Sequence, residues 1–267
     1  MTSKKTAVVT LYCMIFFLAG TFSISGREKE SDLKDKRITI RMEQQPLGVV
    51  FKYLMENYDI PIGFEESTLD RGRPDFKFYA NLPGQPQNKT QSAGGVGFTW
   101  TYRGRIFKAK KYPITLNAEN ERLVEVFDKI VEQMENYKWE INDGVVNIFP
   151  AKGRDERFEK LMGMNVQRFI LEKGKTVEDI TTNLLSQPEL KRFLEDNKLI
   201  FLGIRYGTAT FVLKAQYGRP LDVKMDFSNL TFRDLLNKIT KIKRGGWVLK
   251  WLWNSSPPGW EYIDIDI

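Results

Sequence analysis

The chain has 267 residues, of which 42% are hydrophobic and 28% charged, so it can form one ordinary domain or two small ones around a packed core. It has no histidine, a single cysteine and a formal net charge of +7. This composition excludes Ser-His-Asp and Cys-His catalysis and metal sites built on histidine or cysteine. Carboxylate pairs or an activated lysine remain as catalytic options.

The first residues have the pattern of an export signal. Two lysines precede an uncharged apolar run over 7–22, and small residues follow it. The run is short for a bilayer span of about 20 residues. We therefore expect a signal peptide over 1–25, cleaved after Ser25, with an uncleaved anchor as the alternative.

Export constrains the compartment and the partners. Without its signal the chain loses Cys13 and two lysines, which leaves no cysteine and a net charge of +5. An exported protein without disulfides is typical of a bacterial periplasm or cell surface. We expect a periplasmic or extracellular location, no membrane span in the mature chain and no nucleic-acid partner. The mild positive charge suits an anionic envelope or an acidic protein, or is simply solvated.

Residues 26–36 are almost all charged and predict a flexible leader. Apolar residues then alternate over 38–42, as on one face of a strand, and recur at steps of three and four over 47–54, as on one face of a helix. A short returning strand over 62–64 completes a β-α-β unit.

The segment 67–112 interrupts this pattern with stretches rich in glycine, proline and polar residues. Short alternating pieces at 76–79 and 98–107 indicate one hairpin inside it. Arg103 and Arg105 contribute to a basic end of this insertion. Long excursions inside compact domains are often functional.

The unit at 113–150 is the clearest one in the first part of the chain. It reads as a strand over 114–118, a helix over 123–134 and two strands joined by a turn at 142–144. The charged segment 151–164 follows as a connector with a short helix, and we place a domain boundary there.

A second pass begins at residue 165. Thr176, with Asp179 three residues later, resembles a capping box and predicts a helix start. The other elements expected before the last unit are strands over 166–171, 199–204 and 208–214 and helical stretches over 177–185 and 190–194.

The last unit repeats the unit at 113–150 without a gap. Its strand positions Val223, Met225 and Phe227 lie 109 positions after their counterparts, and Asn229 matches Asn120 in the same way. A helix over 231–243 and a closing hairpin over 247–267 follow. The repeat predicts an α+β protein of two tandem domains, 37–150 and 165–267, each a βαβ unit followed by a βαββ unit, with helices packed on small sheets.

These units resemble the short N-terminal domain of secretins and TonB-dependent receptors, the STN domain. The resemblance is carried by ITLNAENERLVEVFDKI (114–130), VKMDFSNLTFRDLLNKI (223–239) and, more loosely, ITIRMEQQPLGVVFKYL (38–54). It implies an exported small α/β domain that binds other proteins and does not catalyse a reaction. No secretin ring or barrel is recognised before Ile267, so the transport role is not carried over.

The closing hairpin holds four of the six tryptophans. Trp247, Trp251 and Trp253 share one face of its first strand. We expect Trp247 under the last helix, and leave Trp251 and Trp253 open between core and contact surface. The candidate binding residues are Trp251, Trp253, Trp260, Tyr262, Arg103 and Arg105.

Two carboxylates, Asp264 and Asp266, point to one face of the last strand. Alternation with isoleucines predicts a solvated outer face, although such a pair can also do acid–base work. The sequence therefore favours a non-catalytic module for protein–protein interaction or assembly in the bacterial cell envelope, without cofactor or metal. The alternatives are a glycan- or cell-wall-binding module and a small carboxylate-based hydrolase.

Overall fold

A computed structural model describes residues 30–70, 99–102, 105–108, 113–201, 220–252 and 261–267. We use "first half" for the described residues up to 150 and "second half" for those from 151 onward. The helices are α2 (Glu30–Asp35), α3 (Leu47–Tyr58), η1 (Thr68–Asp70), α4 (Leu123–Glu132), α5 (Glu156–Gly163), α6 (Val177–Ser186), α7 (Pro188–Asp196) and α9 (Phe232–Lys243). The strands are β1 (Arg37–Pro46), β2 (Ile62–Glu65), β3 (Thr99–Tyr102), β4 (Arg105–Lys108), β5 (Pro113–Arg122), β6 (Tyr137–Asn142), β7 (Val145–Pro150), β8 (Asn165–Leu171), β9 (Leu199–Phe201), β10 (Met225–Thr231), β11 (Gly246–Leu252) and β12 (Glu261–Asp266).

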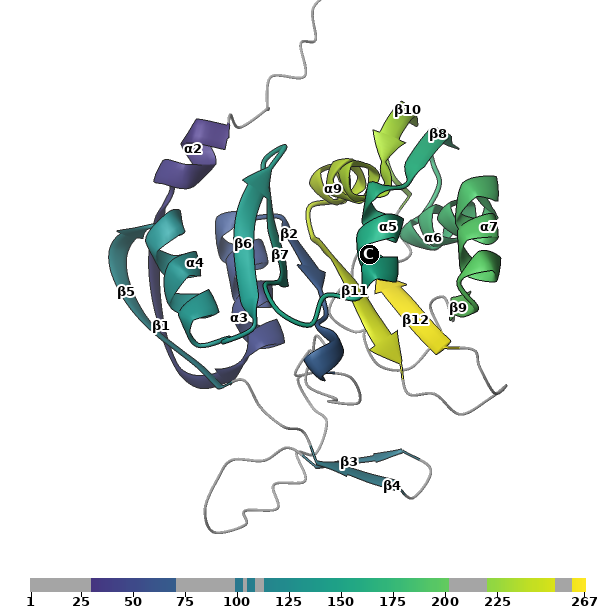
Figure 1. Ribbon diagram of the computed structural model, residues 1–267. Helices are drawn as coiled ribbons and strands as arrows, with labels where there is room; N and C mark the ends of the chain where they lie inside the picture. Colours follow the sequence, from purple (N-terminus) through teal and green to yellow (C-terminus); the bar gives the residue numbers. More distant parts are fainter. Residues whose placement is uncertain (1–29, 71–98, 103–104, 109–112, 202–219, 253–260) are drawn as a thin grey trace, which may run out of the picture.

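The α+β class predicted from the sequence is confirmed, but the strands pair in an unexpected way (Figure 1). The two strands that flank α3 lie in different sheets: β1 pairs with β5 in an antiparallel ribbon, and β2 joins a six-stranded sheet. The second half repeats this division, because β8 pairs with β10 while β9 joins the six-stranded sheet. The β3–β4 hairpin expected inside 67–112 is present as a separate pair.

In each half, helices lie between a two-stranded ribbon and the six-stranded sheet (Figure 1). In the first half, Ile38 of the ribbon, Phe127 of α4 and Phe64 of the sheet are all buried in one core. In the second half, Phe169 of the ribbon and Ile263 of the sheet belong to another core. The amphipathic helices therefore bury their apolar stripes against strands on both sides.

The six-stranded sheet runs through both halves in the order β6-β7-β2-β11-β12-β9. β2 pairs in parallel with β11, so backbone hydrogen bonds join the halves. Phe64 and its neighbour Val248 face the first core, whereas Trp247 and Leu249 face the second core. Because successive strand residues point to opposite faces, the two halves cover opposite faces of one sheet. The sequence pattern predicted small sheets and did not indicate this shared one.

The strands β2 and β11 approach each other closely because both carry a glycine at the contact. A Cβ atom on Gly63 would lie 2.3 Å from Cε2 of Trp247, so the indole occupies the space that a side chain would need. A Cβ atom on Gly246 would lie 2.6 Å from the carbonyl oxygen of Ile62. We call this contact between β2 and β11, with the side chains packed across it, the joint.

Helix α9 of the second half also contacts the first half, at the turn between β6 and β7. Lys241 donates to Oδ1 of Asp143 at 3.0 Å, and Lys238 donates to Oδ2 at 3.3 Å. Asp143 belongs to the β6–β7 turn, where Asp143 (φ 49°) and Gly144 (φ 73°) have the left-handed backbone of a tight two-residue hairpin. The turn predicted at 142–144 is thus confirmed, and it also serves as an anchor for α9.

The internal repeat is visible in the backbone. Asn120 and Asn229 both have left-handed conformations, with φ values of 55° and 53°, shortly before α4 and α9. Asparagine tolerates this region better than most residues, which explains why the same residue type recurs at the same place. The N-cap expected at Thr176 is confirmed, since its hydroxyl accepts from the Asp179 N–H.

Two expectations were wrong in detail. Part of the charged leader predicted over 26–36 forms α2, whose Leu33 is only 1% exposed. A single apolar residue on the inner side of α2 is enough to fix this helix against the first core, which composition alone does not reveal. The strand expected from Val223 begins at Met225 instead, and Val223 is exposed. The strand expected at 208–214 and the piece at 76–79 lie outside the described residues.

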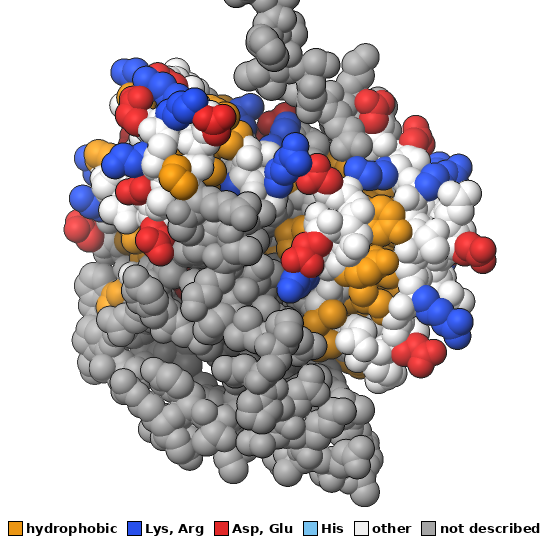
Figure 2. All heavy atoms as spheres, turned by 180° about the vertical axis from the view of Figure 1, so that it is seen from behind, with side chains coloured by type: hydrophobic (Ala, Val, Ile, Leu, Met, Phe, Trp, Pro, Cys, Tyr) orange, Lys and Arg blue, Asp and Glu red, His pale blue; other side chains and the backbone are white. Residues whose placement is uncertain are grey.

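The molecular surface carries charges of both signs. On the face drawn in Figure 2, lysine, arginine, aspartate and glutamate side chains of the described residues are interspersed, beside a smaller group of hydrophobic side chains. Such a mixed pattern is typical of a solvated surface. Among the described residues, no helix is long and apolar enough to cross a membrane.

Candidate functional site

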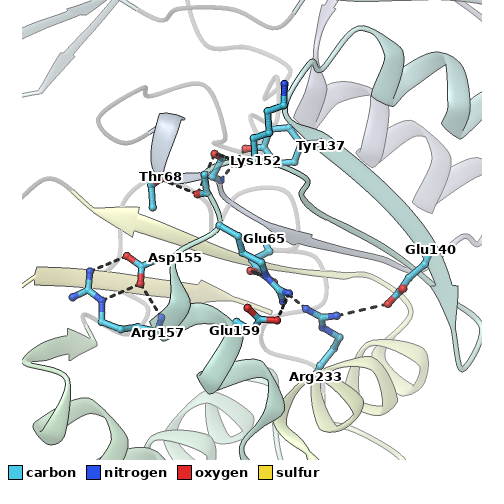
Figure 3. A network of polar contacts seen from close by, with 12 residues as sticks. Glu65, Thr68, Tyr137, Glu140, Lys152, Asp155, Arg157, Glu159 and Arg233 are labelled. Carbon is cyan, nitrogen blue, oxygen red and sulfur yellow. Dashed lines mark hydrogen bonds and ion pairs between the residues drawn. The ribbon is translucent and has the colours of Figure 1, made fainter.

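A group of charged side chains surrounds Glu65, the last residue of β2 (Figure 3). Its side chain is 1% exposed. Because Phe64 next to it faces the first core and successive strand residues point to opposite faces, the Glu65 side chain points away from that core. Arg154 donates from Nε to Oε1 at 2.7 Å and from Nη2 to Oε2 at 3.1 Å. Arg233 of α9 donates to Oε2 at 3.0 Å. One buried carboxylate is thus held between two guanidinium groups from different segments.

An aromatic ring and two further carboxylates complete this group. The ring of Phe149 lies 5.5 Å from the Arg154 guanidinium carbon and 5.2 Å from that of Arg233. Glu159 pairs with Arg154 at 3.4 Å, and Glu140 pairs with Arg233 at 3.7 Å. We call Glu65, Phe149, Arg154 and Arg233 the Glu65 cluster. It brings together β2, β7, the connector and α9 at the joint.

The electrostatics of the cluster favour permanent charge. Burial alone would lower the pKa of Arg154, but its hydrogen bonds and charge interaction with Glu65 raise the pKa above its usual value. Both carboxylate oxygens of Glu65 already accept hydrogen bonds. A carboxylate in this position holds chain segments together, because its oxygens point at the arginines that bind it.

Next to the cluster, the start of the 67–112 insertion is tied to the connector (Figure 3). The Ser67 N–H donates to the hydroxyl of Tyr137 at 3.0 Å, and the Thr68 N–H donates to the Gly153 carbonyl at 2.8 Å. The Ser67 hydroxyl donates to the Lys152 carbonyl at 3.0 Å. These bonds fix the point at which the chain leaves the sheet.

A second group of side chains lies around Trp251 of β11. Its indole stacks on Phe158 of α5 with ring centres 4.4 Å apart, and the Arg157 guanidinium lies 4.8 Å from it. Arg157 pairs with Asp155 and with Glu261. The hydrogen bond to Asp155 raises the pKa of Arg157, against the opposing effect of burial, and the bond to Glu261 raises it further.

This arrangement removes Trp251 from the candidate contact surface. The residue is 6% exposed, and its backbone N–H donates to Oε2 of Glu66 at 2.6 Å. The prediction left Trp251 open between core and surface, and the structure places it in the core. The reason is α5, which precedes the second ribbon and covers the indole. Trp247 is buried as expected, and its Nε1 donates to Oδ1 of Asn237 of α9 at 2.9 Å.

The structure brings none of the other predicted binding residues into one described site. Trp253, Trp260 and Arg103 lie outside the described residues. Tyr262 belongs to β12 and Arg105 to β4, and the description of these two does not extend to their side chains.

The expectation of a solvated carboxylate pair on β12 was wrong for Asp264. Its side chain is 13% exposed and pairs with Lys250 of the neighbouring strand at 3.2 Å. Lys250 faces away from Trp251 on the same strand and lies in a buried ion pair. For Asp266 only the backbone is described.

Sequence reasoning missed the Glu65 cluster altogether. Arg154 lies 89 positions from Glu65 and Arg233 lies 168 positions from it, so no local pattern links them. One signal was available: Glu65 ends an otherwise apolar strand, where an acidic residue needs a partner once buried. The identity of that partner follows only from the pairing of β2 with β11.

The described residues contain no group of three or more aspartate, glutamate, histidine or cysteine side chains placed to hold a metal ion. A scan against known protein families and searches of curated proteins and of solved structures found no match to the chain. The site must therefore be interpreted from its own geometry.

Proposed function

We propose that this chain is an exported, non-catalytic module for protein–protein interaction or assembly in the bacterial cell envelope, as the resemblance to STN domains implies. The observation on which the proposal rests is that β6 is an edge strand of the six-stranded sheet. This strand has six residues and pairs with β7 on one side, and no described strand pairs with its other side. An unpaired strand edge is a template for adding a strand from another chain.

The hydrogen bonds of β7 identify the groups that β6 presents. The Val146 N–H donates to the Pro61 carbonyl at 3.0 Å, and so points away from β6. Opposite residues of an antiparallel pair exchange both hydrogen bonds or neither. Ile141, which lies opposite Val146, therefore directs its N–H and C=O outward, and so does Trp139 two positions earlier.

The Glu65 cluster is a less suitable contact site than β6, because its buried carboxylate is already bound within the chain. Glu65 accepts three hydrogen bonds from arginine side chains of its own chain. These charges hold the two halves together. Of the two outer strands of the described sheet, β6 has six residues and β9 has three, so β6 offers the longer edge for a partner.

The test is capture from the envelope fraction of the organism that makes this protein, with a tagged chain lacking 1–25 as bait. We expect specific envelope proteins to be retained by the wild-type chain and by Ile141→Val. We expect them to be lost with Ile141→Pro, which removes one outward N–H while leaving the bonds to β7. Capture of no protein by the wild-type chain would refute the proposal. Equal capture by all three baits would move the contact away from β6.

A further inference from the structure

The open edge of β6 is self-complementary, and we propose that it pairs with the same edge of a second copy of this chain. The two β6 strands would run antiparallel about a two-fold axis at Trp139, giving a closed dimer with one continuous sheet. This inference rests on the proposed function, because it names the partner of the same edge. Two-fold symmetric contacts are the commonest way in which identical chains associate.

The backbone fixes which residues can lie on the axis. Trp139 and Ile141 direct their N–H and C=O groups away from β7. In an antiparallel pair of two copies, residues whose backbone N–H and C=O point away from β7 must lie opposite each other. The two-fold axis therefore passes through such a residue or through the residue between two of them. These positions are Trp139, Glu140 and Ile141. An axis at Ile141 would place Trp139 opposite Asp143 of the other copy, which lies in the turn beyond the end of β6, so the choice is between Trp139 and Glu140.

Charge decides between these two registers. With the axis at Trp139, Lys138 of each copy lies opposite Glu140 of the other copy, so that opposite charges meet twice. With the axis at Glu140, this residue would lie opposite its own copy. Like charges directly opposite on neighbouring strands are destabilising, and opposite charges are stabilising. Both side chains are exposed, that of Glu140 to 47%.

The other face of β6 adds apolar contact to the same register. Trp139 is half-buried and held in place, because its Nε1 donates to Oδ1 of Asp128 at 2.8 Å and its ring lies 5.5 Å from that of Phe127. Ile141 is half-buried as well. In the proposed dimer the two Trp139 side chains lie side by side, and each Ile141 lies opposite Tyr137 of the other copy. Pairing therefore covers the apolar surface that one copy leaves partly exposed.

Lys138 and Glu140 also have contacts within their own chain that remain compatible with pairing. Lys138 Nζ lies 4.9 Å from the ring centre of Phe149, and Glu140 lies 3.7 Å from Arg233. Neither contact is a close hydrogen bond, and both side chains stay exposed. The dimer would extend this charge network from one copy to the next.

The test measures mass in solution for the chain without 1–25, by light scattering and sedimentation at protein concentrations from about 1 to about 100 µM, the range in which micromolar affinities are resolved. We expect a reversible dimer. Lys138→Glu alone places carboxylates opposite each other, and Glu140→Lys alone places ammonium groups opposite each other. Each single variant should weaken dimerisation about tenfold or more.

Two rescue arms make the result specific to the proposed register. The double variant Lys138→Glu/Glu140→Lys restores opposite charges and should dimerise to within about threefold of wild type. Mixing the two single variants should give a heterodimer, because one contributes two acids and the other two lysines. The mixture keeps the test valid even where the double variant folds poorly. Thermal unfolding of each single variant checks that it is folded.

A wild-type chain that stays monomeric at the highest concentration would overturn the inference. Single variants that dimerise as wild type does, or rescue arms that remain as weak as the singles, would also overturn it. The inference and the proposed function fail separately. A monomer that still captures an envelope protein refutes only the dimer, whereas a dimer that captures no other protein refutes the proposal of a separate envelope partner.

Discussion

The two halves of the molecule use equivalent strands in different ways. β6 and β11 each follow a helix and each form an antiparallel pair with the next strand, β7 or β12. The outer edge of β11 is covered by β2 of the other half, whereas the outer edge of β6 has no partner among the described strands. The same repeated unit thus pairs with the other half of the molecule in one copy and has an edge without a described strand partner in the other.

Two glycines account for much of this difference. Gly246 begins β11 after a link of two residues from α9, and Gly63 of β2 makes room for Trp247. In the first half, the link from α4 to β6 has four residues, and β6 begins with Tyr137 in place of a glycine. A close parallel neighbour is therefore accommodated at β11, while at β6 the outward backbone groups remain available. The comparison teaches that equivalent strands of a repeat can have different neighbours: one is paired inside the fold and the other ends the sheet.

The largest effect on the joint is expected from Glu65→Gln. This change removes the buried carboxylate, which is 1% exposed, and leaves Arg154 and Arg233 only their longer ion pairs with the exposed Glu159 and Glu140. It should lower the free energy of unfolding by about 3 kcal/mol. The matched control is Glu159→Gln, whose side chain is 67% exposed, with a change of less than about 0.5 kcal/mol. Urea unfolding followed by circular dichroism measures both. A small loss at Glu65 would show that the cluster does not hold the joint.

The next effect is expected from Gly63→Ala. The added Cβ atom would lie 2.3 Å from the Trp247 ring, so the joint must open, with a loss of about 2 kcal/mol. Gly163→Ala in α5 is the control, because a Cβ atom there has nothing within 4 Å and alanine favours a helix. Tryptophan fluorescence during denaturation checks the prediction. If both alanine variants unfolded at the same denaturant concentration, the close approach at Gly63 would not matter.

A smaller effect, equal in the two halves, is expected at the left-handed asparagines. Asn120→Ala and Asn229→Ala should each cost about 1 kcal/mol, because alanine resists positive φ values, whereas glycine at either position should be close to neutral. Thermal unfolding of the four variants measures this. Clearly unequal costs in the two alanine variants would argue against structural equivalence of the two units.

The smallest effect concerns the contact of α9 with the β6–β7 turn. Burial alone would raise the pKa of Asp143, but its hydrogen bonds and charge interactions with Lys241 and Lys238 lower it overall below the ordinary value of 3.8. This stabilisation is therefore fully present above about pH 4 and is lost as the pH falls through the lowered pKa. Asp143→Asn should cost about 0.5 kcal/mol at neutral pH.

The same variant provides the pH test for this contact. The stability difference between wild type and Asp143→Asn should shrink as the pH falls below about 4, because the wild-type carboxylate then becomes protonated. Denaturation curves at several acidic pH values measure the difference. A gap that stays constant with falling pH would mean that the Asp143 charge does not anchor α9.

Hydrophobic period and turn chemistry were enough to predict most individual elements. The strand, helix and hairpin of 113–150 are present as β5, α4, β6 and β7, and the repeat 109 positions later is present as β10 and α9. These predictions succeeded because they depend on residues within a few positions of one another. The helix α2 was missed because its stability comes from Leu33 packing against another part of the chain.

What the sequence by itself determined is therefore local: the α+β class, the repeated unit and the turns and caps that bound its elements. Only the tertiary structure decided that β2 pairs with β11, that Glu65 lies between Arg154 and Arg233, and that Trp251 is buried while β6 keeps an open edge. The physical reason is that the backbone N–H and C=O groups of a strand edge are the same for nearly all residue types, so the local sequence does not specify which strand pairs with it. Which edge meets which is fixed by how closely two backbones can approach and by which buried charges are then paired.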